Sequence, residues 1–379
     1  MNTVYKYAAT CLFGLEKFVG ETIDRLGYKR LDTIDGRVYF EGDVSAVARC
    51  NIQFRCAEKL YIVLKEFSSE TFDALFEGTK SVEWEKYVGK NDAFIVTGHS
   101  IKSKLHSIPD CQRIIKKAIA TRLASAYKTD TLPETATKIG IEFFILKDTC
   151  ALMINTSGEG LYKRGWRKET GAAPMRETLA AALALIAHPS RDTVFYDAMC
   201  GSGTIAIEAA LILKNVSCGA LRHFAAENYN FIPKSIWEKA RDEAEKGVLD
   251  DNFKVWASDI DPHMIKIAKE NAKRAGVLDN IRFFVRDIAD IDTEGERGTL
   301  VCNPPYGERL LDVQSAEALY RVMGRAFQNL GSWKYYVFTS SQYFEKHFGR
   351  KADNTRKMYN GMLRCFYYQY YKNNKTERQ

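Results

Sequence analysis

The loop Asn303-Pro304-Pro305-Tyr306 carries the side chains best suited to chemistry in this sequence. Two adjacent prolines stiffen the backbone and remove two N–H donors, so the loop is rich in acceptors, namely the Asn303 side-chain carbonyl and the backbone carbonyls. Such acceptors could hold the hydrogens of an exocyclic base amine and free its lone pair for in-line attack on a methyl sulfonium. Tyr306 could hold a base pulled out of its stack. A structural Pro-Pro turn is the alternative interpretation.

A glycine-rich turn lies upstream of that loop, in the stretch DAMCGSGT from Asp197 to Thr204. It joins an apolar strand to a helix, and its glycines allow the backbone to approach a ligand closely. The spacing lacks the third glycine of a dinucleotide fingerprint and the Gly-Lys-Ser/Thr of a phosphate-binding loop. Taken alone, the turn fits a ligand site and an ordinary strand–helix turn equally well.

Carboxylates end the next two predicted strands, at Asp259 and Asp287. The first could accept two hydrogen bonds from a ribose diol and the second could accept from an adenine amino group. Together with the glycine turn they form a nucleoside-binding set. The common alternative for each acid is a helix N-cap, and that alternative is favoured for Asp261, which precedes Pro262.

Basic residues are concentrated in two stretches. Residues 99–128 hold seven Lys or Arg against one acid, and residues 162–176 interleave basic side chains with Tyr162 and Trp166. Basic side chains contact phosphates and aromatic rings stack on unpaired bases, whereas a solvated helix face is the alternative for the helix at 113–128. The predicted RNA-binding residues are Lys102, Lys104, Arg113, Lys116, Lys117, Lys163, Arg164, Trp166 and Arg167.

The elements that must position these residues alternate between strands and helices from residue 161 onward. Strands are expected at 194–197, 254–258, 281–285, 299–302, 335–339 and 363–370, and helices at 204–213, 262–275 and 316–329. This alternation predicts a parallel, doubly wound α/β sheet, with a closing antiparallel hairpin after the turn at Asn360-Gly361. The glycine turn, the acids and the Asn-Pro-Pro-Tyr loop all follow strand ends.

Two smaller α/β units are predicted before this domain. The first, residues 1–65, has strands expected at 5–11, 37–41 and 60–65 and helices at 14–26 and 43–50, the second with Asp43 as its N-cap. The second unit, residues 66–160, has strands expected at 93–98, 138–146 and 150–155 and an amphipathic helix at 110–127. Residues 161–379 form the third predicted domain.

The bulk composition sets limits on the class of protein. A chain of 379 residues with 46% hydrophobic residues can build two or three folded domains, and its net charge of +7 is compatible with a polyanionic partner. Its nine Cys and six His show no metal-binding spacing, so reduced thiols and no metal site are expected. The sequence shows no signal segment or membrane span, which predicts a soluble cytoplasmic protein with no membrane partner.

These motifs resemble the class I S-adenosylmethionine-dependent methyltransferases that methylate amines, whose hallmark is Asn/Asp-Pro-Pro-Tyr/Phe. Residues 98–107 with 112–117 are similar to the THUMP RNA-binding domain, and residues 160–167 with 172–180 resemble that family's link to its catalytic domain. The stretch NPPYGERL at 303–310 closely resembles the large-subunit rRNA guanine-N2 methyltransferases. The resemblance is weakest before residue 60, where such proteins carry a ferredoxin-like domain.

The resemblance implies a Rossmann-like methyltransferase domain preceded by ferredoxin-like and THUMP domains, with S-adenosylmethionine as cofactor. It assigns Asn303, Pro304, Pro305 and Tyr306 to the catalytic loop. The implied cofactor-binding residues are Asp197, Gly201, Ser202, Gly203 and Thr204 at the methionine part, Asp259 and Ile260 at the ribose, Asp287 at the adenine, and Pro174, Arg176 and Glu177 packed nearby.

The expected function is therefore methylation of a guanosine N2 amine in 23S rRNA or in a large-subunit precursor. A tRNA guanine-N2 methyltransferase is the nearest alternative. DNA adenine-N6 methylation shares the loop, but the THUMP-like region and the lack of a recognisable target-recognition domain argue against it. A non-catalytic RNA-binding ribosome assembly factor is also considered, although the complete cofactor motif argues against it. A nicotinamide-dependent dehydrogenase is disfavoured because the glycine turn lacks its third glycine.

Overall fold

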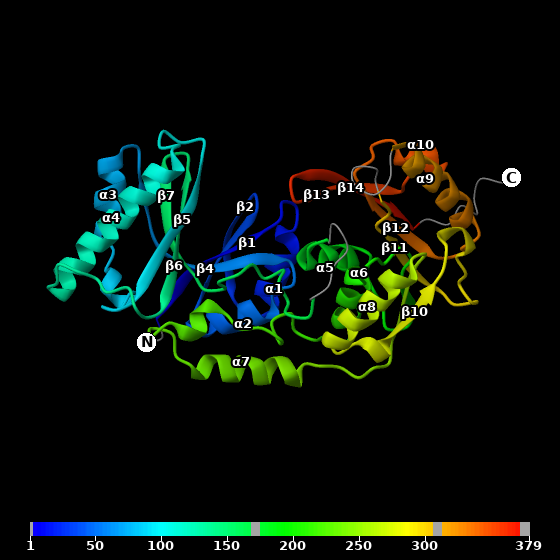
Figure 1. The fold of residues 1–379 in the computed structure, drawn as a ribbon, viewed down its shortest axis with the longest axis horizontal. Coiled ribbons are helices and arrows are strands. Elements are labelled where there is room, and N and C mark those ends of the chain that lie inside the picture. The colour runs from blue at the N-terminus through cyan, green and yellow to red at the C-terminus, as the bar shows by residue number, and fades with distance from the viewer. Residues whose placement is uncertain (1–2, 168–174, 306–312, 372–379) are drawn as a thin grey trace. The chain divides into compact units, whose positions relative to one another are not determined.

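A computed structural model describes residues 3–167, 175–305 and 313–371 of the chain. The chain forms two compact units (Figure 1). The N-terminal unit contains residues 1–11, 16–161 and 222–243, and the C-terminal unit contains residues 12–15, 162–221 and 244–379.

The N-terminal unit is built on one seven-stranded sheet in the order β2-β3-β1-β4-β7-β6-β5. Its first half comprises β1 (Tyr5–Cys11), α1 (Glu16–Arg25), β2 (Lys29–Ile34), β3 (Arg37–Gly42), α2 (Ser45–Gln53) and β4 (Ala57–Ser68). Its second half comprises α3 (Phe72–Lys80), η1 (Trp84–Lys86), β5 (Ala93–Ile101), α4 (Ile108–Tyr127), β6 (Lys138–Leu146) and β7 (Thr149–Asn155).

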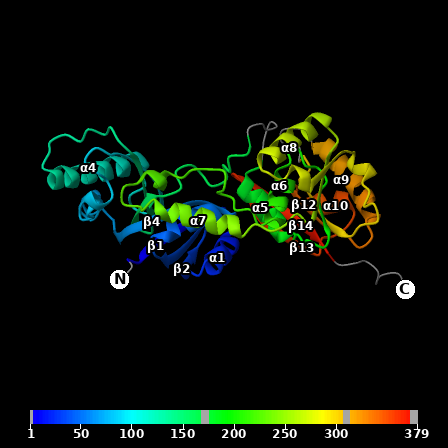
Figure 2. The same ribbon diagram turned by 90° about the horizontal axis from the view of Figure 1, so that it is seen from below.

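The long strand β4 joins the two halves of this sheet. It pairs with β1 over Ala57–Val63 and with β7 over Tyr61–Ser68, so the sheet runs unbroken past the predicted boundary at residues 65 and 66. Helix α4 packs over β5 and against α3 (Figure 1), because Ile115, Ile119 and Leu123 recur at helical spacing and are buried. Figure 2 shows the same helix from below.

A segment from later in the chain also belongs to the N-terminal unit. Residues 222–243 contain η2 (Ala225–Asn228) and most of α7 (Ser235–Lys246). The Tyr229 hydroxyl donates to the Asn155 carbonyl at 2.8 Å, and the Arg49 guanidinium donates to both Glu243 carboxylate oxygens at 2.7 Å. This segment lies inside the range predicted for the third domain, so that unit is not continuous in sequence.

The C-terminal unit is a doubly wound sheet in the order β10-β9-β8-β11-β12-β14-β13. Its strands are β8 (Val194–Asp197), β9 (Lys254–Asp259), β10 (Ile281–Val285), β11 (Gly298–Cys302), β12 (Lys334–Thr339), β13 (Asn354–Asn360) and β14 (Leu363–Tyr370). Its helices are α5 (Glu177–Ile186), α6 (Thr204–Leu213), α8 (Pro262–Arg274), α9 (Val313–Gln328) and α10 (Phe344–Phe348), with short turns η3 (Leu278–Asn280) and η4 (Ile288–Asp290).

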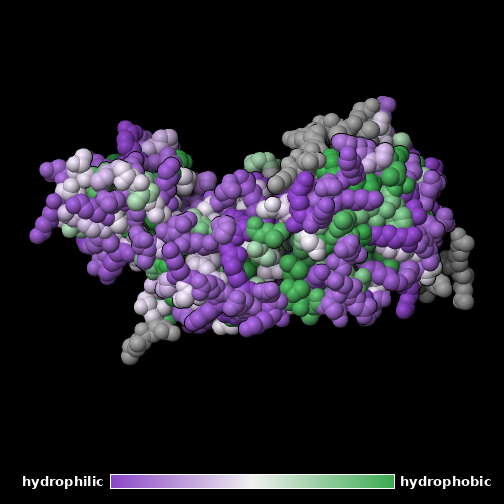
Figure 3. Space-filling view, turned by 60° about the horizontal axis from the view of Figure 1, so that its bottom comes forward, coloured by the Kyte–Doolittle hydropathy of each residue, from purple (hydrophilic) through white to green (hydrophobic). Residues whose placement is uncertain are grey.

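The first five strands in this order, β10 to β12, are parallel, and β14 and β13 close the sheet as an antiparallel hairpin. Both features confirm the predicted fold class. Helix α9 and strands β11 and β12 share a core that includes Leu300, Tyr320, Met323 and Val337. In Figure 3, hydrophobic residues also gather on the visible surface of this unit. Within the described ranges, no helix is long and apolar enough to cross a bilayer.

Candidate active site

Three predicted site residues come together at one edge of the C-terminal sheet. Asp197 is the last residue of β8, Asp259 is the last residue of β9, and Asn303 directly follows β11. In the parallel registers Asp197 lies beside Ala257 of β9 and beside Val301 of β11. Neighbouring strands are about 4.8 Å apart, so the sheet brings the acids and the Asn-Pro-Pro loop to the same edge.

The glycine turn between β8 and α6 is held in a shape that only glycine adopts easily. Gly203 has φ +84°, and a Cβ atom there would lie 3.0 Å from the Cβ of Ala268 on α8. The Asn271 side-chain amide, also on α8, donates to the Ser202 carbonyl at 3.1 Å. Helix α8 therefore supports the turn by close packing and by a hydrogen bond.

Asp197 is completely buried beneath this turn. Its Oδ2 accepts from the Ala206 N–H at 3.1 Å, whereas Oδ1 has no hydrogen-bond donor among the described residues. Burial disfavours the anion and raises the pKa of Asp197 to about 7. A buried carboxylate oxygen without a donor is costly, so this position suits a ligand that brings a donor or a positive charge.

Asp259 fixes the turn from the neighbouring strand. Its Oδ2 accepts from the Gly201 N–H at 2.8 Å and its Oδ1 accepts from the Asp261 N–H at 3.0 Å. A carboxylate has about four lone-pair directions, so both oxygens retain capacity for hydroxyl donors. Ile260 beside it is 64% exposed.

Asp261 and Asp287 both cap helices. Asp261 accepts from the His263 N–H at 2.8 Å at the start of α8, as the alternative interpretation of the sequence expected. Asp287 accepts from the Ala289 N–H at 2.9 Å at the start of η4. The cap uses one oxygen of the half-buried Asp287, so it is compatible with a ligand contact at the other.

The Asn-Pro-Pro loop presents a second buried acceptor. Asn303 Oδ1 is shielded from solvent and has no hydrogen-bond donor in the described part of the chain. Pro304 after it is buried. Tyr306, the predicted aromatic member of the loop, lies outside the described residues, as does Pro174.

Two ion pairs anchor the link at 162–167 to the C-terminal unit. The Arg164 guanidinium lies 3.1 Å from Glu208 on α6, and the two side chains are 2% and 0% exposed. The Arg167 guanidinium lies 3.2 Å from Glu177 on α5 and donates to the Thr204 hydroxyl at 2.9 Å. Burial raises the pKa of Glu177 to about 7. Arg167 thus ties the link to the first residue after the glycine turn, a role that the sequence pattern did not indicate.

These positions correct part of the predicted RNA-binding set. Arg164 and Trp166 are each 2% exposed, and the Arg167 side chain is 10% exposed. Side chains this buried cannot reach a phosphate or stack on a base without local unfolding, so they hold the link in place instead. Lys163 is exposed, and Arg176 lies over the Tyr162 ring at 4.7 Å.

The remaining basic residues of the set lie in the N-terminal unit and are exposed. They are Lys102, Lys104, Arg113, Lys116 and Lys117. Lys104 pairs with Glu70 and Arg113 pairs with Asp110, and these exposed pairs contribute little to stability. Their cations could therefore exchange to phosphates at low cost.

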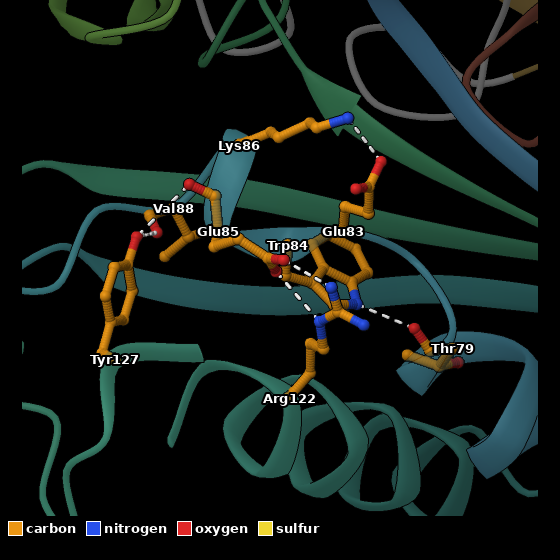
Figure 4. Close-up of polar contacts among 8 residues, drawn as sticks. All are labelled: Thr79, Glu83, Trp84, Glu85, Lys86, Val88, Arg122 and Tyr127. Carbon is orange, nitrogen blue, oxygen red and sulfur yellow. Dashed lines mark hydrogen bonds and ion pairs between the residues drawn. The ribbon is translucent and has the colours of Figure 1, made fainter. Parts of the chain in front are cut away.

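Arg122, from the same basic stretch, is held in an ion pair within the N-terminal unit (Figure 4). It forms a bidentate pair with Glu85 of η1, and the Tyr127 hydroxyl donates to the Val88 carbonyl at 2.8 Å. Trp84, fully buried, donates to the Thr79 carbonyl at 2.8 Å. The C-terminal half of α4 is therefore fastened to η1 and its neighbours, and its exposed lysines lie nearer the start of the helix.

No cluster of His, Cys, Asp or Glu able to hold a metal ion occurs among the described residues. The parallel sheet order, the glycine turn and the two buried unpartnered acceptors at one edge define a class I methyltransferase domain.

Comparison with known proteins identifies the family of this chain. The methyltransferase domain described as RMKL-like (UPF0020) matches residues 164–369, the RlmL ferredoxin-like domain matches residues 6–61, and the THUMP domain matches residues 69–155.

The chain belongs to this family of RMKL-like methyltransferases that carry ferredoxin-like and THUMP domains. It is 43% identical to a Bacillus subtilis (strain 168) protein named "Putative RNA methyltransferase YpsC", over 99% of this chain and 98% of that protein. A solved structure from Listeria monocytogenes str. 4b F2365, described as a predicted N6-adenine-specific DNA methylase, is 45% identical with a TM-score of 0.92, over 98% of this chain and 97% of that one.

A third relative bears on the cofactor. SMU.472, described as a putative methyltransferase complexed with SAH, is 38% identical with a TM-score of 0.92 and covers 98% of this chain and 99% of its own. The methyl donor of this methyltransferase is S-adenosylmethionine. The residues present fit that molecule, because the buried Asp197 oxygen without a donor suits its cationic amino group and the Asp259 oxygens suit its ribose hydroxyls.

Proposed function

We propose that this enzyme methylates the exocyclic N2 amine of a guanosine in 23S rRNA. The observation that carries the proposal is the Asn303 side-chain carbonyl, a buried acceptor without a donor, next to the strand that ends in Asp197. An amine is the substrate group that supplies two donor hydrogens. A hydroxyl could satisfy this acceptor but has no second hydrogen for a backbone carbonyl of the loop, and a ring carbon offers neither.

The loop prepares the amine rather than deprotonating it. S-adenosylmethionine supplies an electrophilic methyl group on a sulfonium. Asn303 Oδ1 and a backbone carbonyl of the proline loop accept the two amine hydrogens, which turns the nitrogen lone pair out of conjugation with the base. No strong base is required, because the nitrogen becomes acidic once it is methylated. Catalysis then rests on orientation, which can supply several powers of ten in rate.

We also assign roles in cofactor binding to the predicted residues. Asp197 faces the amino group, Asp259 with Ile260 holds the ribose, and Asp287 holds the adenine through the carboxylate oxygen that does not cap η4. The backbone from Gly201 to Thr204 lies against the methionine part. Arg176 and Glu177, at the start of α5, approach the cofactor, and Arg167 pairs with Glu177 and donates to Thr204. Pro174 is assigned to the same group on its sequence alone.

RNA is favoured as the substrate by the THUMP domain and by its exposed lysines. Lys102, Lys104, Lys116 and Lys117 lie within sixteen positions of each other and would contact phosphates together with Arg113. The names of the relatives differ on this point, since one is called an RNA methyltransferase and another a DNA methylase. The description as an RNA methyltransferase agrees with the THUMP domain, so RNA is the proposed substrate.

The direct test is methyl transfer from tritiated S-adenosylmethionine to unmodified 23S rRNA, unmodified tRNA and duplex DNA in parallel, with the labelled product identified by nucleoside chromatography. N2-methylguanosine from 23S rRNA alone is the expected result. An Asn303→Ala sample run beside the wild type controls for contaminating activity.

Any other labelled product would change the proposed substrate or the proposed chemistry. N2-methylguanosine from tRNA would keep the amine chemistry and replace the rRNA substrate. N6-methyladenosine from DNA would overturn the RNA assignment. No label in any pool, with normal cofactor binding, would contradict methylation of free RNA and favour a precursor particle or a non-catalytic RNA-binding assembly factor.

The affinity for S-adenosylmethionine should weaken as the pH falls below about 7. With its pKa raised to about 7, Asp197 is largely protonated at lower pH and cannot balance the donor's cationic amino group. The dissociation constant should rise by up to about tenfold per pH unit well below the pKa, as expected for uptake of one proton. Isothermal titration calorimetry between about pH 5.5 and pH 8.5 measures it.

Two variants test whether Asp197 is the source of this pH dependence. Asp197→Asn should bind weakly with little pH dependence, whereas Asp250→Asn, at an exposed carboxyl of the same unit, should keep the wild-type profile. The stability of the cofactor-free fold should change with pH in the opposite direction to the cofactor affinity. A carboxyl with a raised pKa stabilises the cofactor-free fold at low pH, and this contribution disappears as the pH rises from about 4 through about 7. Unchanged affinity across the range would contradict the role of Asp197.

A further inference from the structure

An exposed tyrosine lies on the side of the sheet edge that the cofactor residues leave open. The acids and Ile260 that we assign to the nucleoside of the cofactor follow β9 and β10, on one side of β8. The catalytic loop follows β11 on the other side of β8, and β12 lies beyond it. We therefore expect a substrate base that meets the Asn-Pro-Pro loop to lie near the segment that follows β12.

That segment is residues 340–343, between β12 and α10. Strands β11 and β12 lie side by side (Figure 1). They are parallel, and Val337 is the register partner of Cys302. Continuing this register places Thr339 opposite Pro304, so residues 340–343 leave the sheet next to the catalytic loop. Tyr343 is the last of them, immediately before α10.

Tyr343 is held firmly and yet presents its ring to solvent. The side chain is 70% exposed, and it makes no hydrogen bond or ring contact with the described residues. Its backbone is fixed, because its N–H donates to Ser341 Oγ at 3.3 Å and the Tyr368 hydroxyl donates to the Ser341 carbonyl at 3.0 Å. The Ser341 N–H donates to Thr339 Oγ1 at 3.2 Å.

We infer that Tyr343 is a substrate-binding residue whose ring stacks on a nucleobase of the RNA at or next to the methylated nucleotide. A positioned aromatic ring close to a catalytic loop is the feature that single-stranded nucleic acid sites use, because every base has a face to stack. Lys346, exposed one helical turn further along α10, supplies a cation for the adjoining phosphate. The inference rests on the proposed RNA substrate and extends it to a second contact beside the loop.

The test compares Tyr343→Ala, Tyr343→Phe and Tyr371→Ala in the full chain. Tyr371 is a matched control, because it is an exposed tyrosine that follows β14, which is antiparallel to β12 and so ends at the opposite edge of the same sheet. We expect kcat/KM on unmodified 23S rRNA to fall about five- to a hundredfold in Tyr343→Ala, and to stay within about twofold of wild type in the other two. Affinity for S-adenosylmethionine should be unchanged in all three.

A second measurement does not depend on turnover. Fluorescence anisotropy with a short, single-stranded, guanosine-rich RNA, in the presence of S-adenosylhomocysteine, should show weaker binding for Tyr343→Ala and recovery in Tyr343→Phe. If wild type methylates neither rRNA nor tRNA, the proposed function fails and the anisotropy series still decides the role of Tyr343. Equal binding and equal kcat/KM in Tyr343→Ala and wild type would overturn the inference.

Discussion

Replacing Asn303 by alanine should lower kcat for methyl transfer by about a hundredfold or more, with little change in affinity for S-adenosylmethionine. The wild-type carbonyl is a buried acceptor that gains its donor only when the amine arrives, so its removal affects the reacting nitrogen and not the cofactor. Single-turnover rates with saturating RNA, alongside calorimetric cofactor affinities, separate the two effects.

Two companion variants sharpen this prediction. Asn303→Asp keeps an acceptor at the same position and should retain more activity than Asn303→Ala. Asn329→Ala removes an exposed asparagine just after α9, away from the catalytic loop, and should behave as wild type. A fully active Asn303→Ala enzyme would show that the loop works through its prolines and backbone alone.

The largest effect on stability is expected for Arg164→Ala. Arg164 and Glu208 are both buried, and removal of the arginine leaves a carboxylate inside the C-terminal unit without its counter-charge. Breaking one partner of such a pair typically costs about 3–5 kcal/mol in the free energy of unfolding. Urea denaturation, followed by tryptophan fluorescence, measures the loss.

The control for this variant uses an exposed pair in the same unit. Lys254 pairs with Glu296, and the two side chains are 59% and 37% exposed, so Lys254→Ala should cost no more than about 1 kcal/mol. The double variant Arg164→Met with Glu208→Leu should recover much of the stability, because a buried ion pair can be replaced by apolar side chains of similar volume. Equal losses in the two single variants would argue against a structural role for the buried pair.

Much of the C-terminal sheet could be predicted because its strands are short apolar runs with glycine, proline or acidic residues at their ends. Residues 194–197, 281–285 and 363–370 form strands with the predicted bounds, and 204–213 forms a helix with the predicted bounds. Strand β13 was missed, although the turn after it was expected, because its residues Asn354–Asn360 are mostly polar and it lies at the sheet edge. Periodicity carries little information for such strands.

The positions of the site residues along the chain could be predicted, but the burial of their side chains could not. The motifs marked Asp197, Asp259 and Asn303, and the sheet order brings them to one edge. Composition does not show which of these side chains are buried. A basic, aromatic stretch at 162–167 has the pattern of an RNA-binding segment, yet Arg164 is buried because Glu208, a residue 44 positions later, lies in the apolar helix α6. That pairing is a tertiary contact and leaves no local signal.

The domain boundaries show a similar effect of tertiary structure. The prediction divided the chain at residues 65 and 160, where composition changes. Strand β4 crosses the first of these positions, since one long strand pairs on both sides. Residues 222–243 pack with the N-terminal unit even though they follow α6 in the chain, and their polar helix α7 gives no indication of which unit it covers.

This interleaving limits how the protein can be divided or recombined. The chain passes between the two units at 11/12, 15/16, 161/162, 221/222 and 243/244, so one proteolytic cut between residues 161 and 162 would leave them joined through the other crossings. A chimera that moves the THUMP-bearing unit to another catalytic domain would need residues 222–243 as a separate insert. The N-terminal unit is thus completed only after residues 162–221 of the C-terminal unit have been synthesised, and a nascent chain that ends at residue 161 would lack part of its packing.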